Sequence, residues 1–320
     1  MKQTSHATSH KVIFLLTALA LGACSGGGGG SGSTTTGGSS GGSSGGSGDI
    51  GAVGVTGTGT STDPWTMPTE NETGLTKTLK DYLADGGYWQ FIFDGATVTA
   101  SGTAATFGTT AVYDTVNDTW TITVDGVDQI LTGPMVYGNY GSCGPAPCME
   151  MHIFDAGSTV AQYGTFGNVS ASTTSGTNQL FFHTGLNTPV ANLPGSATYT
   201  GYFEGTSTAA LGYTVDNSVS MTADFGAGIF TFSSAGTVID YTGTLANYTL
   251  DSTSVTISGN SYNGAMTGSL TLVGGTTDST YTGSIEGAFY GPAAEQTAGA
   301  VVVENGTGER IQGGFWGIIP

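Results

Sequence analysis

The segment YTGSIEGAFYG, residues 281–291, is the clearest indication of the fold in this 320-residue chain, and YTGYFEG at residues 199–205 repeats its pattern. Side chains alternate between the two faces of a strand, so Tyr281, Ile285 and Phe289 share one face with the glycines of the segment. A face that alternates large and minimal side chains suits the interior of a narrow closed barrel. The stretch therefore predicts a strand of a small barrel.

The opposite face of these strands carries Glu286 and, in the echo, Glu204, and we expect both carboxylates to point to solvent. Period-two patterns continue through the last third of the chain, as expected for antiparallel strands. Together with the two echoed segments they predict an eight-stranded antiparallel barrel over residues 196–320. The further strands are expected at 219–225, 229–232, 237–245, 249–257, 262–272, 300–304 and 311–318.

The preceding part, residues 75–190, predicts a second β-rich domain. It opens with a short helical pattern from Leu75 to Leu83, which Gly86 and Gly87 end. From there the pattern is period two, as in the strand at 120–124. Prolines and weak periodicity over residues 187–195 mark a boundary. We therefore expect an all-β protein with an N-terminal handle-like domain and a C-terminal barrel.

The N-terminus is typical of an exported lipoprotein. Lys2 and Lys11 precede an apolar run that ends in Leu-Gly-Ala-Cys at Cys24, which is similar to a bacterial lipobox. We expect residues 1–23 to be a signal peptide and Cys24 to be lipidated; the alternative is a secreted protein with a chance cysteine. Residues 24–74 are expected to form a tether, because residues 26–48 contain only Gly, Ser and Thr, a composition that behaves as a flexible coil.

Charge excludes one class of partner. Beyond residue 24 the chain has 23 acidic residues and three basic ones, Lys77, Lys80 and Arg310, which gives a formal charge of 3 − 23 = −20. Nucleic-acid binding needs a patch of Lys and Arg that displaces counterions from phosphates. Three scattered cations cannot form one.

The closing segments resemble a known family. FYGPAAE at residues 289–295, then Gly299, and finally GGFWG at residues 313–317, resemble the closing strands of the transferrin-binding-protein-B-like β-barrel surface lipoproteins. That family also includes factor H binding and haemophore-like members. The resemblance implies a non-catalytic barrel displayed on the outer membrane of a Gram-negative bacterium, anchored in lipid. The implied ligand is an iron carrier, haem or another host or environmental protein.

Further partners follow from the same resemblance. A TonB-dependent receptor and a lipoprotein-export translocon are possible companions of such a protein. An alternative function is a structural or adhesive surface lipoprotein with no soluble ligand. Catalysis is not expected, because the folded part of the sequence shows no nucleophile–base pair, metal cluster or nucleotide loop.

Cys143 and Cys148 are the only cysteines after Cys24. In an oxidising compartment a disulfide between two such residues is the default, and a five-residue spacing closes a small loop. A metal or redox role would need further ligands or a thioredoxin-like spacing. We therefore expect a structural disulfide.

The two histidines beyond the signal peptide are candidate haem ligands. Haem iron accepts His, Met or Tyr as an axial ligand. A pocket could therefore combine His152 and His183 with Met151, Tyr137 and Tyr140. The alternative is that each is an ordinary strand residue whose polar group is satisfied within the fold.

Overall fold

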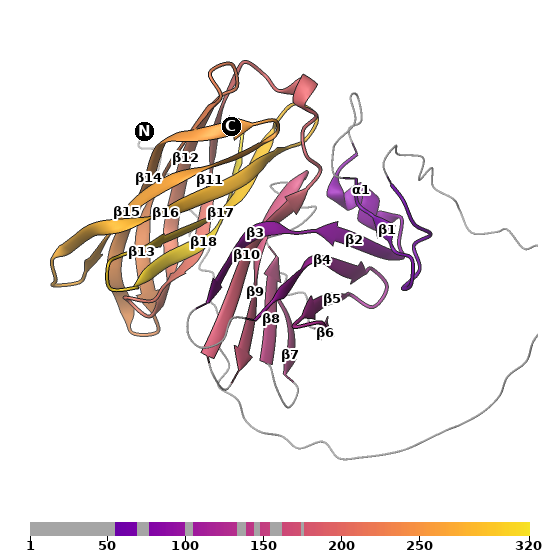
Figure 1. Cartoon of the computed structure of the whole chain (residues 1–320), viewed down its shortest axis with the longest axis horizontal. Helices are drawn as coiled ribbons and strands as arrows, with labels where there is room; N and C mark the ends of the chain where they lie inside the picture. Colours follow the sequence, from indigo (N-terminus) through magenta and orange to yellow (C-terminus); the bar gives the residue numbers. More distant parts are fainter. Residues whose placement is uncertain are drawn as a thin grey trace, which may run out of the picture. The chain divides into compact units, whose positions relative to one another are not determined.

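The computed structural model of this protein describes residues 55–68, 77–99, 105–132, 139–143, 148–153, 162–173 and 176–320. All of them belong to one of the chain's two compact units, residues 47–320. They form a ten-stranded sheet followed by a closed eight-stranded barrel (Figure 1). The expected all-β fold class, with a β-rich part before an antiparallel barrel, is confirmed. No helix in these ranges is long and apolar enough to cross a membrane.

The ten-stranded sheet is antiparallel throughout, except where its short first strand pairs with β2. That first strand lies within the range 24–74 expected to be tether, so part of that range is folded into the sheet. In spatial order the strands are β1 (Trp65–Thr66), β2 (Tyr88–Ile92), β4 (Phe107–Asp114), β5 (Thr119–Val124), β6 (Val127–Thr132), β7 (Asn139–Cys143), β8 (Cys148–Ile153), β9 (Gly164–Thr173), β10 (Gly176–Gly185) and β3 (Asp94–Thr99).

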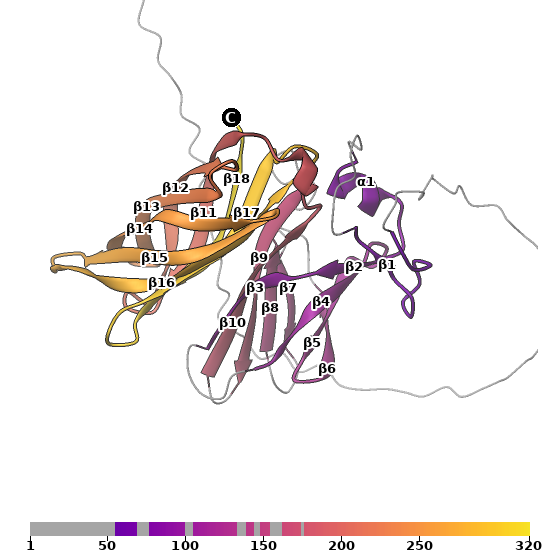
Figure 2. The ribbon, with the colours of Figure 1, turned by 45° about the horizontal axis from the view of Figure 1, so that its top comes forward.

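The two ends of this sheet come together. Strands β2 and β3 lie near opposite ends of the strand order, yet only Phe93 separates them in the chain, so they run end to end (Figure 2). The sheet must therefore curl around its own apolar core. Phe93 is buried there and stacks on Phe182 of β10, with ring centroids 3.9 Å apart.

The one α-helix among the described residues, α1, spans Leu79–Ala84. Its capping box consists of Thr78 and Asp81: the Thr78 side chain accepts from the Asp81 backbone, and the Asp81 side chain accepts from the Thr78 backbone. Leu79 and Tyr82 are buried in the core of the sheet, with the Tyr82 ring edge-on to Trp89. The helical pattern in the sequence is confirmed, although the described helix begins at Leu79.

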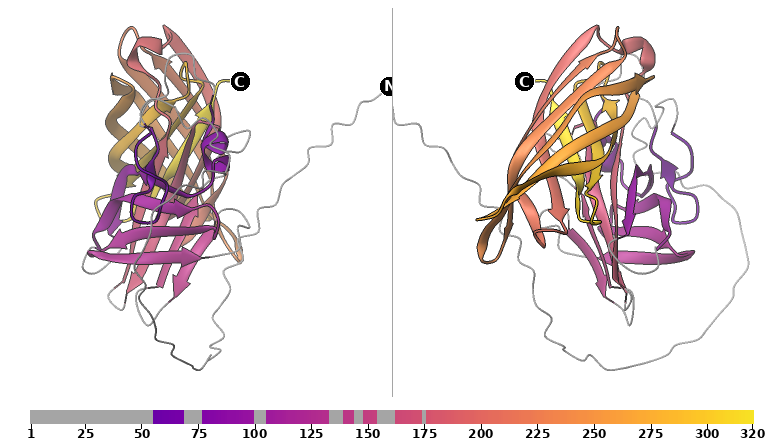
Figure 3. Two further views of the ribbon diagram at one scale, coloured as in Figure 1. Left: turned by 90° about the vertical axis from the view of Figure 1, so that its right-hand side faces the viewer. Right: turned by 60° about the vertical axis from the view of Figure 1, so that its left-hand side comes forward.

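The barrel closes because its first strand pairs with its last. Figure 3 shows the ribbon from two further directions. Each strand pairs antiparallel with the next along the chain, and hairpin turns connect them. The short 3-10 helix η1, Val190–Asn192, precedes it. The strands are β11 (Ser196–Ser207), β12 (Gly212–Asp224), β13 (Ile229–Asp240), β14 (Gly243–Ser258), β15 (Ser261–Leu272), β16 (Thr277–Tyr290), β17 (Gln296–Glu304) and β18 (Arg310–Ile318).

Large rings and glycines share the barrel interior, as the sequence predicts. Tyr281, Ile285 and Phe289 are all buried in the barrel core. A Cβ atom added at Gly299 would lie 2.6 Å from the ring of Phe315. The ring therefore fills the space that a side chain at position 299 would need.

The prediction of one strand in the barrel is wrong. The sequence predicts a strand over 237–245, but the chain turns between Asp240 and Gly243, where β13 ends and β14 begins. The Asp240 carboxylate builds this turn by accepting from the backbone N–H groups of Thr242 and Gly243, at 2.6 and 3.2 Å. The strands predicted at 229–232 and 249–257 are present, but each is part of a longer strand, β13 and β14 respectively.

The outward face of β16, β17 and β18 contacts the ten-stranded sheet. Phe166 of β9 packs against Ala288, Tyr290 and Ala298 in a buried apolar cluster. The Gln296 side-chain oxygen accepts from the backbone N–H groups of residues 163 and 164. This second layer means that strands of the barrel wall are buried on both faces.

Candidate functional site

The residues predicted for a haem site lie mainly on β7 and β8. On the backbone Tyr140 lies opposite Met151, and His152 lies opposite Asn139. Met151 is buried in the core of the ten-stranded sheet. Tyr137 lies outside the described residues. The haem grouping therefore stays a prediction for Tyr140, His152 and Tyr137.

The structure describes the backbone positions of two of the three cysteines, Cys143 and Cys148. Cys143 ends β7, Cys148 begins β8, and their Cα atoms are cross-strand partners. Residues paired across antiparallel strands have Cα separations of about 4.5 to 5.5 Å, which a disulfide can bridge. The disulfide stays a prediction, and so does the lipidation of Cys24, which lies outside the described residues.

His183 is not available to a ligand. It is 4% exposed, and its Nδ1 atom shares a 2.5 Å hydrogen bond with the hydroxyl of Tyr290. This bond joins β10 of the sheet to β16 of the barrel. Desolvation lowers the pKa of His183 to about 4, although the charge of Asp94, its cross-strand neighbour, acts in the opposite direction. Burial also raises the pKa of Tyr290 well above its usual range, so both rings are neutral near pH 7.

Glu286 and Glu204 do not project freely into solvent, which corrects the expectation from the sequence. Both are only partly exposed. Among the described residues, Glu286 Oε1 is buried without a hydrogen-bond partner. Burial, and then the charge of Asp94, raise the pKa of Glu286. For Glu286 the reason is the second layer: a period-two pattern tells which residues share a face, but not that the ten-stranded sheet covers that face of β16.

Replacing Glu286 with Gln is expected to stabilise the protein by about 1 kcal/mol at pH 7. The fold favours the protonated carboxyl of Glu286, so stability is lost as the pH rises through the raised pKa of this group. The amide carries no charge at any pH. Urea unfolding midpoints of the two proteins should therefore differ at pH 7 and converge at a pH where Glu286 is protonated. A lower midpoint for the variant at pH 7 would contradict the argument.

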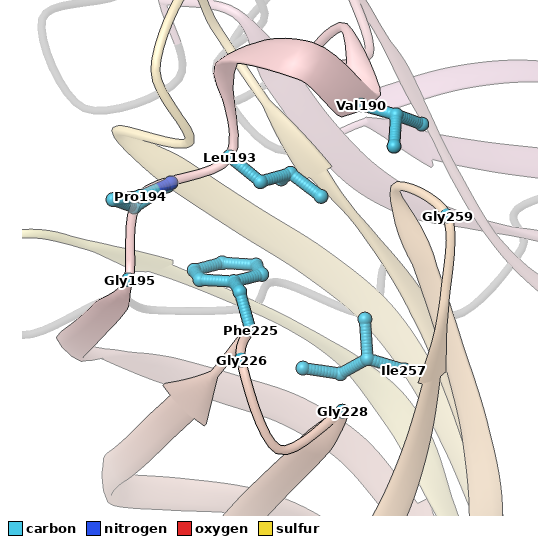
Figure 4. Close-up of a pocket in the computed structure, with 9 residues that line it drawn as sticks. All are labelled: Val190, Leu193, Pro194, Gly195, Phe225, Gly226, Gly228, Ile257 and Gly259. Atoms are coloured by element: carbon cyan, nitrogen blue, oxygen red, sulfur yellow. The ribbon is translucent and has the colours of Figure 1, made fainter.

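In the ranges that the structure describes, no three His, Cys, Asp or Glu side chains are grouped as metal ligands would be. Residues 186–195, which connect β10 to the barrel, are called the linker. A pocket of about 430 Å³ opens at the barrel end next to η1, between the linker and two hairpin turns (Figure 4). Its side-chain walls are Val190, Leu193, Pro194, Phe225 and Ile257.

This pocket offers apolar contact and no iron ligand. Leu193 lies over the ring of Phe225, with Ile257 beside it (Figure 4), and these three side chains pack against the barrel core. The linker is held in place, since Phe225 N–H donates to Gly195 O and the Asn260 side chain donates to Thr188 O. The lining contains no His, Met, Tyr or Cys.

The opposite end of the barrel exposes large apolar side chains. Three hairpin tips carry them: Leu211 lies between β11 and β12, Tyr241 lies between β13 and β14, and Leu272 ends β15 with Val273 following it. Leu211 is 83% exposed, Tyr241 71% and Val273 65%. These turns lie at the barrel end away from η1 and the C-terminus (Figure 1). We call Leu211, Tyr241, Leu272 and Val273 the tip residues.

Sequence reasoning missed the tip residues. Hydropathy favours burial of Leu, Tyr and Val, so an exposed apolar residue at a turn has no periodic signal. The Asp-x-x-Gly pattern at residues 240–243 is a turn signature that could have located one of the tips.

Comparison with family models and with curated proteins gave no match. Among solved structures, a mutant of transferrin-binding protein B from Haemophilus parasuis has a TM-score of 0.44 at 18% identity, covering 72% of this chain and 45% of that chain. The protein of that name from serogroup B Neisseria meningitidis has a TM-score of 0.43 at 18% identity, covering 72% and 44%.

The N-lobe of lactoferrin-binding protein B from Moraxella bovis has a TM-score of 0.33 at 14% identity, covering 53% of this chain and 79% of that chain. These structures are of the kind that the sequence resemblance names. The chain spans less than half the length of the two transferrin-binding proteins.

Proposed function

We propose that this chain is a lipid-anchored binding protein of the bacterial outer surface, which holds a protein ligand, in particular an iron carrier, and performs no catalysis. Cys24 would carry the anchor, and residues 26–48 would lift the folded part away from the lipid headgroups. Such a tether serves a protein that meets its ligand in the surrounding medium.

The observation that carries the proposal is the apolar end of the barrel. Isolated exposed apolar residues are ordinary on a protein surface, but here four of them occupy three successive hairpin tips of one barrel end. Tyrosine is among the residues most enriched where proteins bind each other, and large apolar side chains fill partner pockets. The tip residues therefore favour a protein ligand.

Haem has less support as the ligand. His183, one of the two candidate histidines, is buried and bonded to Tyr290. The apolar pocket beside η1 has the size of a small-molecule site but no side chain that ligates iron.

The test is a binding panel with the full lipoprotein in detergent, using transferrin, lactoferrin, haemoglobin and free haem as probes. At least one protein probe should bind saturably, and the variant Leu211→Ser/Tyr241→Ser/Val273→Ser should weaken that binding about tenfold or more. Val116→Ser is the matched control, since Val116 is 81% exposed at the turn between β4 and β5. Binding by no probe, or equal binding by the triple variant, would overturn the proposal.

A further inference from the structure

The three tips form one surface. Tyr213 of β12 lies opposite Ile239 of β13, so the tips that begin just beyond these residues lie side by side. Val273 N–H donates to Leu245 O at 2.8 Å, which places the third tip beside the β13–β14 hairpin. Since neighbouring strands are about 4.8 Å apart, the tip residues cover a patch on the order of 15 Å across.

Leu211 is held on this patch at an energetic cost. The backbone φ angle of Leu211 is 48°. This lies in the left-handed region, which residues other than Gly, Asn and Asp seldom adopt. Being 83% exposed, it gains little from packing within the fold. A glycine would make the same turn without strain. A strained, exposed leucine is the kind of outlier from which a binding role is inferred.

Carboxylates surround the patch. Asp240 ends β13, and its side chain also accepts from the Thr242 hydroxyl at 2.6 Å. Asp278 lies at the start of β16 and accepts from Thr280 and Asn305, at 2.6 and 2.9 Å. These hydrogen bonds lower the pKa of both carboxyls, so both are ionised at neutral pH.

The remaining charges at this end add to the same sign. Glu304 and Glu309 flank the turn between β17 and β18, and the one cation there, Arg310, is paired with Glu304 through its Nε atom. Four carboxylates against one guanidinium leave 4 − 1 = 3 negative charges around the tip residues. An apolar patch with a negative rim is complementary to an apolar patch with a positive rim.

We propose that the partner of this barrel end is a basic protein, which presents an apolar surface bordered by Lys and Arg to the tip residues. This inference rests on the proposed function and specifies the chemistry of its ligand. A second copy of the chain would bring like charges together, and anionic lipid headgroups would meet the same repulsion. The net charge of the chain would also speed the approach of a basic partner at low salt.

The test uses a phage library of random twelve-residue peptides as the probe. The library is selected on the full lipoprotein and then depleted on the variant Leu211→Ser/Tyr241→Ser/Val273→Ser, whose charge is unchanged. The enriched peptides should combine Lys or Arg with aromatic or aliphatic residues. Their affinity should fall about tenfold between 50 and 300 mM salt.

A charge variant separates the rim from the patch. Asp240→Asn/Asp278→Asn/Glu309→Gln keeps an acceptor oxygen at each position and removes three charges, and it should weaken the same peptides about tenfold. Val116→Ser should leave them unchanged. Enrichment of neutral or acidic peptides, or affinities insensitive to salt and to the charge variant, would overturn the inference.

Other occupants give distinct results, and each would also overturn it. A dimer in sedimentation that the triple variant abolishes would assign the patch to self-association, and tip-dependent binding to phosphatidylcholine vesicles would assign it to lipid. The outcome is independent of the iron-carrier panel. Cationic peptides with no bound carrier would leave this inference standing while the proposed function fails.

Discussion

Lowering the pH from 7 to 4 is expected to cost roughly 3 kcal/mol of stability through His183 alone. The buried ring has a pKa of about 4 in the folded protein and about 6.5 in the unfolded chain. Between these two pKa values, His183 is protonated in the unfolded chain and neutral in the folded protein. Stability is therefore fully present above pH 6.5 and is lost as the pH falls toward 4.

The measurement is the urea midpoint as a function of pH for the wild type and for His183→Gln, which keeps a polar group opposite Tyr290. Asp94 on β3 and Tyr290 on β16 face His183, and the charge of Asp94 also acts on Glu286 of β16. They are the same in both proteins, so the difference in slope between pH 6.5 and 4 reports His183. Parallel curves would show that the imidazole is not held neutral by its burial.

Phe289→Ala is expected to destabilise the barrel by about 3 to 5 kcal/mol. The Phe289 side chain is fully buried, and its ring centroid lies 4.7 Å from that of Phe225 and 5.0 Å from that of Tyr262. Truncation removes these contacts and leaves a cavity that the barrel wall can fill only in part. Calorimetry or urea unfolding gives the value.

Tyr241→Ala is the matched control, because it also removes an aromatic ring from the barrel but at an exposed tip. We expect a change within about 0.5 kcal/mol. A loss at position 289 no greater than that at position 241 would contradict the assignment of Phe289 to the core.

The barrel was predictable because its strands repeat one pattern. The alternation in residues 281–291 assigns Tyr281, Ile285 and Phe289 to the interior, and the structure places them there. The turn at Tyr241 was missed because neither of its central residues is Gly or Pro; the Asp240 side chain sets it instead. Side-chain hydrogen bonds of this kind leave only a weak trace in sequence periodicity.

The surroundings of the barrel were not predictable from one sequence. The sequence pattern predicts that Glu286 faces solvent, but β16 contacts β10 and β3 of the sheet, which lie more than a hundred residues away in the chain. His183 reads as a possible iron ligand, and its partner Tyr290 lies 107 positions further on. Contacts between segments so distant in sequence have no local pattern.

The curl of the ten-stranded sheet bears on how the protein is made. Strand β3 follows β2 in the chain, but it pairs with β10. Ala96 of β3 therefore pairs with Phe181, which is synthesised 181 − 96 = 85 residues later. Pairings with so large a sequence separation form slowly, because a long loop must close first. A nascent chain that ends before residue 176 leaves β3 as an open edge, so this sheet stays incomplete until more than half of the protein has been synthesised.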